Sequence, residues 1–281
     1  MLIRYGFRLK FDVHQPTAIL ARLDVHPSRR NHILSESPLG FAGAEAPSPY
    51  VDLHGNLYRR LTALPGTSAL ELSGLIEDPG TYEPQLSDEP AWPVSDLPED
   101  ALVYLVASRY CETDHLGPIA WQLFGHSPNG AARVRAIVDY VHNRLTFGYQ
   151  FARPTRTALE AHNERVGVCR DFAHLTVTLC RCLNIPARYV NGYLGDIGVP
   201  RDPAPMDFSA WVEVFLGGRW FTVDARHNTP RIGRVVLARG RDAADVPLIH
   251  SFGPHILGEF SVVTEEVQKA ALPSTFEQMA A

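Results

Sequence analysis

One cysteine stands where a long helix is expected to begin. Residues 166–174 read VGVCRDFAH, which places Gly167 two positions before Cys169. From Cys169 onward, apolar residues recur at helical spacing until the Asn-Ile-Pro sequence at 184–186 ends the run. Backbone dipoles place partial positive charge at a helix N-terminus, which lowers the pKa of a thiol and favours the thiolate. The sequence therefore predicts a nucleophilic Cys169.

A β-hairpin is predicted after this helix. Residues 187–194 are strand-like, and residues 209–216 and 219–224 flank the hairpin signal Gly217-Gly218. In that register Leu216 faces Arg219, Trp211 faces Asp224, and Ser209 faces Arg226. Ser209 and Asp224 would then share one face as diagonal neighbours, roughly 7–8 Å apart at the backbone.

The rest of the chain predicts an α+β protein of two domains. Alternating residues at 2–13, 17–25, 57–64 and 69–75, with turns at 52–56 and 65–66, predict a small antiparallel β-domain over residues 1–78. Residues 79–101 are rich in Pro and acidic residues and are interpreted as a linker. Helical periodicity at 131–145 and about 157–163 places a helix-containing core in residues 102–281, with a C-terminal extension of unassigned role.

Composition argues against several classes of function. The net charge is −5 and no basic run occurs, so neither nucleic acid nor an anionic membrane is an expected partner. The N-terminus lacks the apolar core of a signal peptide, and no apolar stretch reaches the length of a membrane span. Four cysteines are too few for a disulfide framework, so a reducing cytoplasm is expected. No metal-ligand spacing occurs, and we expect no cofactor or metal.

The order of motifs resembles the bacterial transglutaminase-like superfamily, whose core is a papain-like cysteine-enzyme fold. The resemblance covers about residues 102–240: the cysteine helix, then IPARYVNGY, AWVEV, GRW and VDARHN. The preceding β-domain also looks like the one that accompanies such cores in bacteria. The resemblance implies acyl transfer or hydrolysis at a carboxamide or peptide bond through a thioester, with a peptide, protein or small amide as substrate. Cys169 matches the nucleophile and Asp224 the residue that orients a histidine.

Ser209 occupies the position where the resemblance places that histidine. A serine hydroxyl cannot take up a proton near neutral pH, nor pair with a thiolate as an imidazolium. We therefore expect impaired activity in this form. Three explanations stay open: an engineered inactivation, a non-catalytic peptide-binding pseudoenzyme that uses the same cleft, or a natural site that recruits another base. The oligomeric state is not predicted.

Other residues are weaker candidates for the site. His174 lies five positions after Cys169 and would be turned away from it on a helix. His227 would point to the opposite face of a continuing strand, and only a bend after Asp224 would bring it back. Trp211 and Asp171 could line the site, although packing explains the first and the helix dipole the second. A charge network of Asp171, Arg170 and Glu213 around the cysteine is a further possibility.

Overall fold

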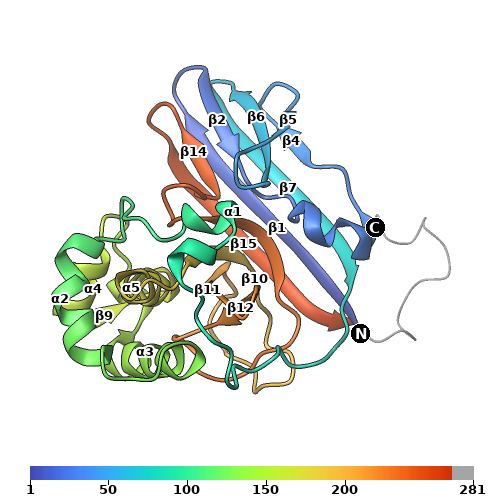
Figure 1. The fold of residues 1–281 in the computed structure, drawn as a ribbon. Helices are drawn as coiled ribbons and strands as arrows, with labels where there is room; N and C mark the ends of the chain where they lie inside the picture. Colours follow the sequence, from blue (N-terminus) through green and yellow to red (C-terminus); the bar gives the residue numbers. More distant parts are fainter. Residues whose placement is uncertain (268–281) are drawn as a thin grey trace.

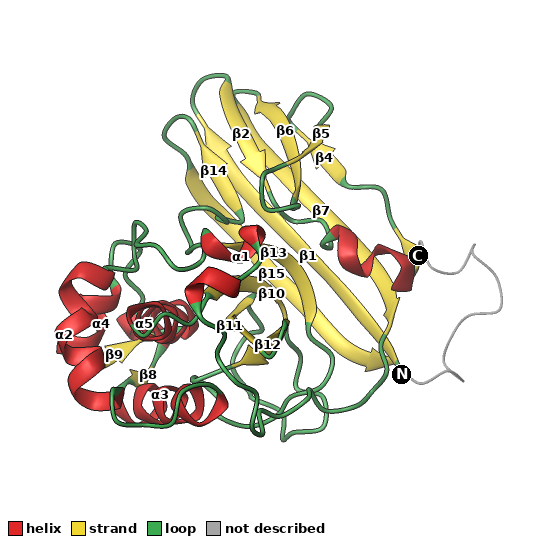
Figure 2. Cartoon of the chain, in the orientation of Figure 1, coloured by secondary structure: helices red, strands yellow, loops and turns green. Residues whose placement is uncertain are grey.

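The computed structural model describes residues 1–267 and shows the α+β architecture expected from the sequence. Figures 1 and 2 show the helices gathered at one end of the molecule, beside long strands that extend away from them. No helix in residues 1–267 combines the length and the apolar character needed to cross a bilayer. The strands are β1 (Leu2–Val13), β2 (Thr17–Ala21), β3 (Ile33–Glu36), β4 (Gly40–Ala42), β5 (Ser48–Val51), β6 (Leu57–Ala63), β7 (Gly66–Glu77), β8 (Thr146–Phe147), β9 (Val166–Gly167), β10 (Ala187–Tyr193), β11 (Ser209–Leu216), β12 (Arg219–Val223), β13 (Val235–Gly240), β14 (Ile249–Ser251) and β15 (Ile256–Val267).

The N-terminal strands form two antiparallel sheets whose apolar side chains share a core. One sheet has the order β15-β1-β7-β3, with β4 also paired to β7, and the other has the order β14-β2-β6-β5. The predicted turn at residues 52–56 connects β5 and β6, and it is closed by a hydrogen bond from the Asp52 N–H to the Asn56 carbonyl and one from the Asn56 N–H to the Asp52 carboxylate. Consecutive strands such as β6 and β7 lie in different sheets, so the Pro-Gly turn between them is a crossover rather than a hairpin.

The C-terminal segment returns to these N-terminal sheets. β15 pairs with β1 along nearly its whole length, from Leu2 opposite Val267 to Asp12 opposite Ile256, and β14 pairs with β2. The sheets therefore draw strands from both ends of the chain, and a division at residue 78 does not coincide with them. Residues 268–281, which were assigned to the second domain, lie outside the described residues.

The cysteine-bearing part is built around helix α5 (Cys169–Cys182). It is surrounded by α2 (Thr113–Phe124), α3 (Ala131–Arg144) and α4 (Ala158–Glu164), and its fourth side packs on the sheet β12-β11-β10-β13. The predicted helices at 131–145 and 157–163 correspond to α3 and α4. Helix α2 was missed, since Pro118 interrupts its pattern. The short α1 (Glu99–Leu102) precedes it.

The core of the β-sandwich extends into the cysteine-bearing part, whose helices pack around a separate core. The Tyr5 ring of β1 lies 5.4 Å from that of Tyr193 at the end of β10, and Phe7 lies 6.3 Å from Phe208. Residues 78–93 between β7 and the helices are irregular but bonded to the core, because the Glu89 carbonyl accepts from the N–H of Ala131 at 2.8 Å. The β-sandwich thus packs directly against the strands that lead to the cysteine helix.

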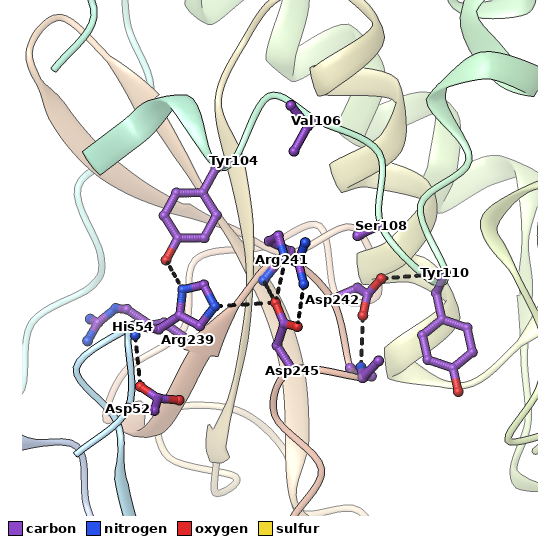
Figure 3. A network of polar contacts seen from close by, with 12 residues as sticks. Asp52, His54, Tyr104, Val106, Ser108, Tyr110, Arg239, Arg241, Asp242 and Asp245 are labelled. Atoms are coloured by element: carbon purple, nitrogen blue, oxygen red, sulfur yellow. Dashed lines mark hydrogen bonds and ion pairs between the residues drawn. The ribbon is translucent and has the colours of Figure 1, made fainter. Parts of the chain in front are cut away.

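A polar network also ties the β5–β6 turn to the cysteine-bearing part (Figure 3). His54 of this turn is 3.0 Å from the Tyr104 hydroxyl through Nδ1 and 3.4 Å from the Asp245 carboxylate through Nε2. Arg241 pairs with the same carboxylate at 2.9 Å. These partners outweigh the effect of burial and hold the pKa of Asp245 well below its usual range.

Candidate active site

The Cys169 loop is held in place by a buried carboxylate. Asp171, in the first turn of α5, accepts a hydrogen bond from the backbone N–H of Val168 at 2.8 Å and another from Arg156 at 3.1 Å. A side chain at Gly167 would place its Cβ 2.6 Å from Asp171, so this position requires glycine. Helix α5 begins at Cys169, as predicted. Asp171 therefore fixes the conformation of the loop that precedes Cys169.

The proposed charge network around the cysteine forms only in part. Arg170 lies 3.8 Å from Asp171, but Glu213 binds Arg188 and Arg239 on another face of the sheet. The prediction that Glu213 joins Asp171 is therefore wrong, because two arginines on neighbouring strands already neutralise it.

The Cys169 thiol lies against the start of β11. The residue is half-buried, and β11, which begins with Ser209 and Ala210, packs against α5. Burial raises the pKa of Cys169 to about 11, although the Arg226 charge and the Ala210 N–H act in the opposite direction. The expectation of a lowered pKa from the helix position is thus not met, because no imidazolium offsets the loss of water around the sulfur.

The hairpin register is the one predicted from Gly217-Gly218. Leu216 pairs with Arg219, and the ladder continues to Val212 opposite Val223. Both glycines have positive φ, as a tight two-residue hairpin turn requires. The ladder stops there, however, so the expected pairs of Trp211 with Asp224 and of Ser209 with Arg226 do not form.

Asp224 begins a tight turn immediately after β12. Its Oδ1 accepts the backbone N–H groups of Arg226 at 3.0 Å and His227 at 3.3 Å. Its Oδ2 binds His227 Nδ1 at 2.8 Å and Arg234 Nη2 at 2.7 Å. Burial alone would raise the pKa of this carboxyl, but Arg234 and His227 outweigh burial and hold the pKa well below its usual range. Asp224 therefore caps its own turn and orients an imidazole.

That imidazole comes from His227, which a continuing strand would have pointed away. The expectation of the opposite face is wrong, because the chain bends at Asp224 and its carbonyl accepts the N–H of Asn228 at 2.8 Å. Helix α3 supports the bend: His142 Nδ1 bonds the Ala225 carbonyl at 2.9 Å, and Asn228 donates to Asp139 at 2.9 Å. These hydrogen bonds hold the turn in a conformation that brings the His227 ring to the Asp224 carboxylate.

Ser209 lines the wall of a groove of about 1200 Å³. Its side chain is 5% exposed, and its Oγ has no hydrogen-bond partner within residues 1–267. Tyr149, Asp207, Arg226 and His227 line the same groove. The groove therefore brings position 209 and the Asp224-bound imidazole to one cavity, and Cys169 is not among the described residues that line it.

Two of the other candidates are buried in packing. Trp211 is 1% exposed and lies under Arg234, whose guanidinium sits 4.7 Å from the ring centre. This agrees with the interpretation of Trp211 as a packing residue, and the Arg234 that lies over it is the one that binds Asp224. His174 is fully buried, stacks on Tyr110, and accepts the Ala243 N–H at 3.1 Å. These contacts hold the His174 ring in the core, on the other side of α5.

Sequence reasoning missed Arg234, Arg226 and Tyr149. Arg234 lies ten residues beyond Asp224 and reaches it only because β13 runs beside β10 in the folded sheet. Tyr149 comes from the loop after α3. The sequence did indicate Arg226, since the predicted hairpin register placed it opposite Ser209.

Comparison with known proteins finds similarity over residues 119–225 and over nearly the whole chain. Residues 119–225 match the sequence model of the transglutaminase-like superfamily. The crystal structure of a candidate cysteine protease from Cytophaga hutchinsonii has a TM-score of 0.82 and 29% identity, covering 98% of this chain and 94% of that one. An uncharacterized protein of Mycobacterium leprae is 30% identical over 148 residues, half of each chain. One of Mycobacterium bovis is 36% identical over 92 residues, 29% of its length. The chain therefore matches half or less of these two relatives.

Proposed function

Starting from a chain that belongs to the transglutaminase-like superfamily, we propose that its site is built for cysteine-dependent acyl transfer or hydrolysis at a carboxamide or peptide bond. One observation carries the proposal. Ser209 begins β11, which packs against the helix that Cys169 begins, and Ser209 also lines the groove that holds the Asp224-bound imidazole. Position 209 thus lies where a base would link nucleophile and carboxylate.

The chemistry follows from these groups. The Cys169 thiolate attacks the carbonyl carbon, the amine leaves with a proton, and the resulting thioester passes its acyl group to water or to another amine. Backbone N–H groups at the start of α5 are placed to stabilise the oxyanion. Peptides, proteins and small amides are the proposed substrates. A reducing cytoplasm stays the proposed location, and the cysteines at 111, 169, 180 and 182 are free thiols.

The present form is proposed to be impaired at the proton-transfer step. Ser209 supplies no base, and a thiol whose pKa is about 11 is almost entirely protonated at neutral pH. Loss of general acid–base catalysis costs roughly 10²–10⁴-fold in rate. We assign the residual proton transfer of this impaired form to His227, because Asp224 orients it and it lines the same groove as Ser209.

The test restores the missing base. Ser209→His should increase the rate at which iodoacetamide alkylates Cys169 near pH 6, measured by intact-protein mass spectrometry, and should raise turnover of a glutamine or peptide amide. Ser209→Ala is the matched control and should leave both rates unchanged. A folded Ser209→His protein that shows neither increase would refute the proposal.

A second candidate is a peptide-binding pseudoenzyme, which the high pKa of Cys169 and the size of the groove favour. It predicts peptide affinity that survives Cys169→Ala and no thioester on Cys169 under any condition. Trapping an acyl adduct on Cys169 by mass spectrometry would decide against it.

A further inference from the structure

We infer that Arg226 is the receptor for a single carboxylate of the substrate, held beside the carbonyl that Cys169 attacks. This inference rests on the proposed function and names its substrate class: peptides or amides with one carboxylate close to the reacting bond, such as the C-terminal residue of a peptide.

Arg226 is held in the groove at both its backbone and its side chain. The backbone N–H donates to Asp224 Oδ1 at 3.0 Å, which fixes the residue in the turn. The guanidinium lies 3.9 Å from the centre of the Phe147 ring, and the side chain lines the groove with Ser209 and Tyr149. A stacked guanidinium loses little further freedom when it binds a ligand.

This guanidinium has no carboxylate partner of its own. Among the ion pairs of residues 1–267, Arg231 is matched to Asp196 and Arg234 to Asp224, whereas none involves Arg226. Asp207 is near but directs its Oδ1 to the N–H of Phe208 at 2.6 Å. A guanidinium that lacks an anion and faces a cavity is suited to bidentate binding of a carboxylate.

The position of the Arg226 guanidinium relative to Cys169 determines where a substrate carboxylate would bind. Phe147, on which Arg226 stacks, pairs with Gly167 in the β8–β9 ladder, two residues before Cys169. A carboxylate on Arg226 would therefore bind near the start of the cysteine helix, and the Arg226 charge accordingly opposes the rise of the thiol pKa. The exposed rim of the same groove carries Asp202, Glu265 and Glu266, which repel further negative charge. The groove thus favours one carboxylate over a polyanion.

The experiment measures binding without catalysis, in the Cys169→Ala protein. The probes are N-acetyl-alanyl-glycine and its C-terminal amide, titrated by NMR. The acid should bind about tenfold more tightly than the amide, as expected for a charge-assisted pair. Arg226→Gln should abolish that difference, and Arg226→Lys, which keeps the charge but loses the planar fork, should retain part of it.

Arg201→Gln is the matched control, since it removes the same charge from an exposed residue of the same groove. It should leave the preference for the acid intact. The inference is overturned if acid and amide bind equally, if neither binds at millimolar concentration, or if Arg201→Gln and Arg226→Gln have the same effect. Because Cys169 is absent, these outcomes are independent of the alkylation test of the proposed function.

Discussion

The Asp224 carboxylate binds the Nδ1 of His227 at 2.8 Å, across a turn that reverses the direction a strand would have taken. Since an ionised carboxylate only accepts hydrogen bonds, His227 carries its proton on Nδ1 and leaves Nε2 available as a base. A carboxylate and an imidazole are therefore paired here, but the imidazole follows Asp224 in the chain instead of standing at position 209.

His227→Gln should slow the acylation of Cys169 by p-nitrophenyl acetate at pH 7 by roughly 10²-fold, the lower end of what a general base contributes. Stopped-flow release of nitrophenolate measures the rate. His115→Gln is the control, because His115 is exposed on α2 and distant in sequence from the turn. Equal rates for the wild type and His227→Gln would show that His227 does not act as the base.

Alkylation of Cys169 should reveal its high pKa. Because burial raises that pKa to about 11, the rate with iodoacetamide should climb about tenfold per pH unit from pH 7 to pH 10 without levelling off. At pH 7 it should be roughly 10²-fold slower than for an ordinary exposed thiol of pKa about 8.5. Peptide mapping after alkylation separates Cys169 from the other three cysteines. A plateau below pH 8 would contradict the burial argument.

Asp224→Asn should reduce stability in a pH-dependent manner. The folded-state pKa of Asp224 lies below its unfolded value, so its charge stabilises the fold above about pH 4 and this contribution is lost as pH falls further. The substitution should therefore lower the free energy of unfolding by about 2–4 kcal/mol at pH 7, since Arg234 stays buried but loses its ion pair with Asp224.

The difference between wild type and Asp224→Asn should shrink below pH 4, because the carboxyl of the unfolded chain takes up a proton there, and it should vanish only below the depressed pKa of the folded state. Urea unfolding at several pH values measures it. Asp202→Asn, on the exposed loop, should change stability little at any pH. A pH-independent difference would mean that Asp224 stabilises the turn only through its shape.

Asp245→Asn should weaken the junction between the β-sandwich and the cysteine-bearing part. The carboxylate is bound by His54 and three times by Arg241, once through the backbone N–H and twice through the guanidinium. Its loss should cost about 1–3 kcal/mol. Hydrogen exchange should then increase in the β5–β6 turn around His54, whereas unchanged protection there would show that the apolar core alone holds the two parts together.

Sequence patterns by themselves determined the local elements of this protein. The apolar period after Cys169 set the start of α5, and Gly217-Gly218 set the register of β11 and β12 down to Val212 opposite Val223. Both depend on interactions between residues close in the chain, which periodicity and turn chemistry describe directly. The motif order likewise predicted the similarity to the transglutaminase-like superfamily that residues 119–225 show, while the reading of position 209 as a missing histidine stays a prediction.

Only the tertiary structure decided how the site is completed. β15 joins β1 across more than two hundred residues, and Arg234 reaches Asp224 only through the folded sheet. The bend that brings His227 to Asp224 depends on side-chain bonds within the turn and on its contacts with α3. The pKa of Cys169 is set by how much water the surrounding fold removes. Each of these is a property of three-dimensional packing, which a one-dimensional pattern does not contain.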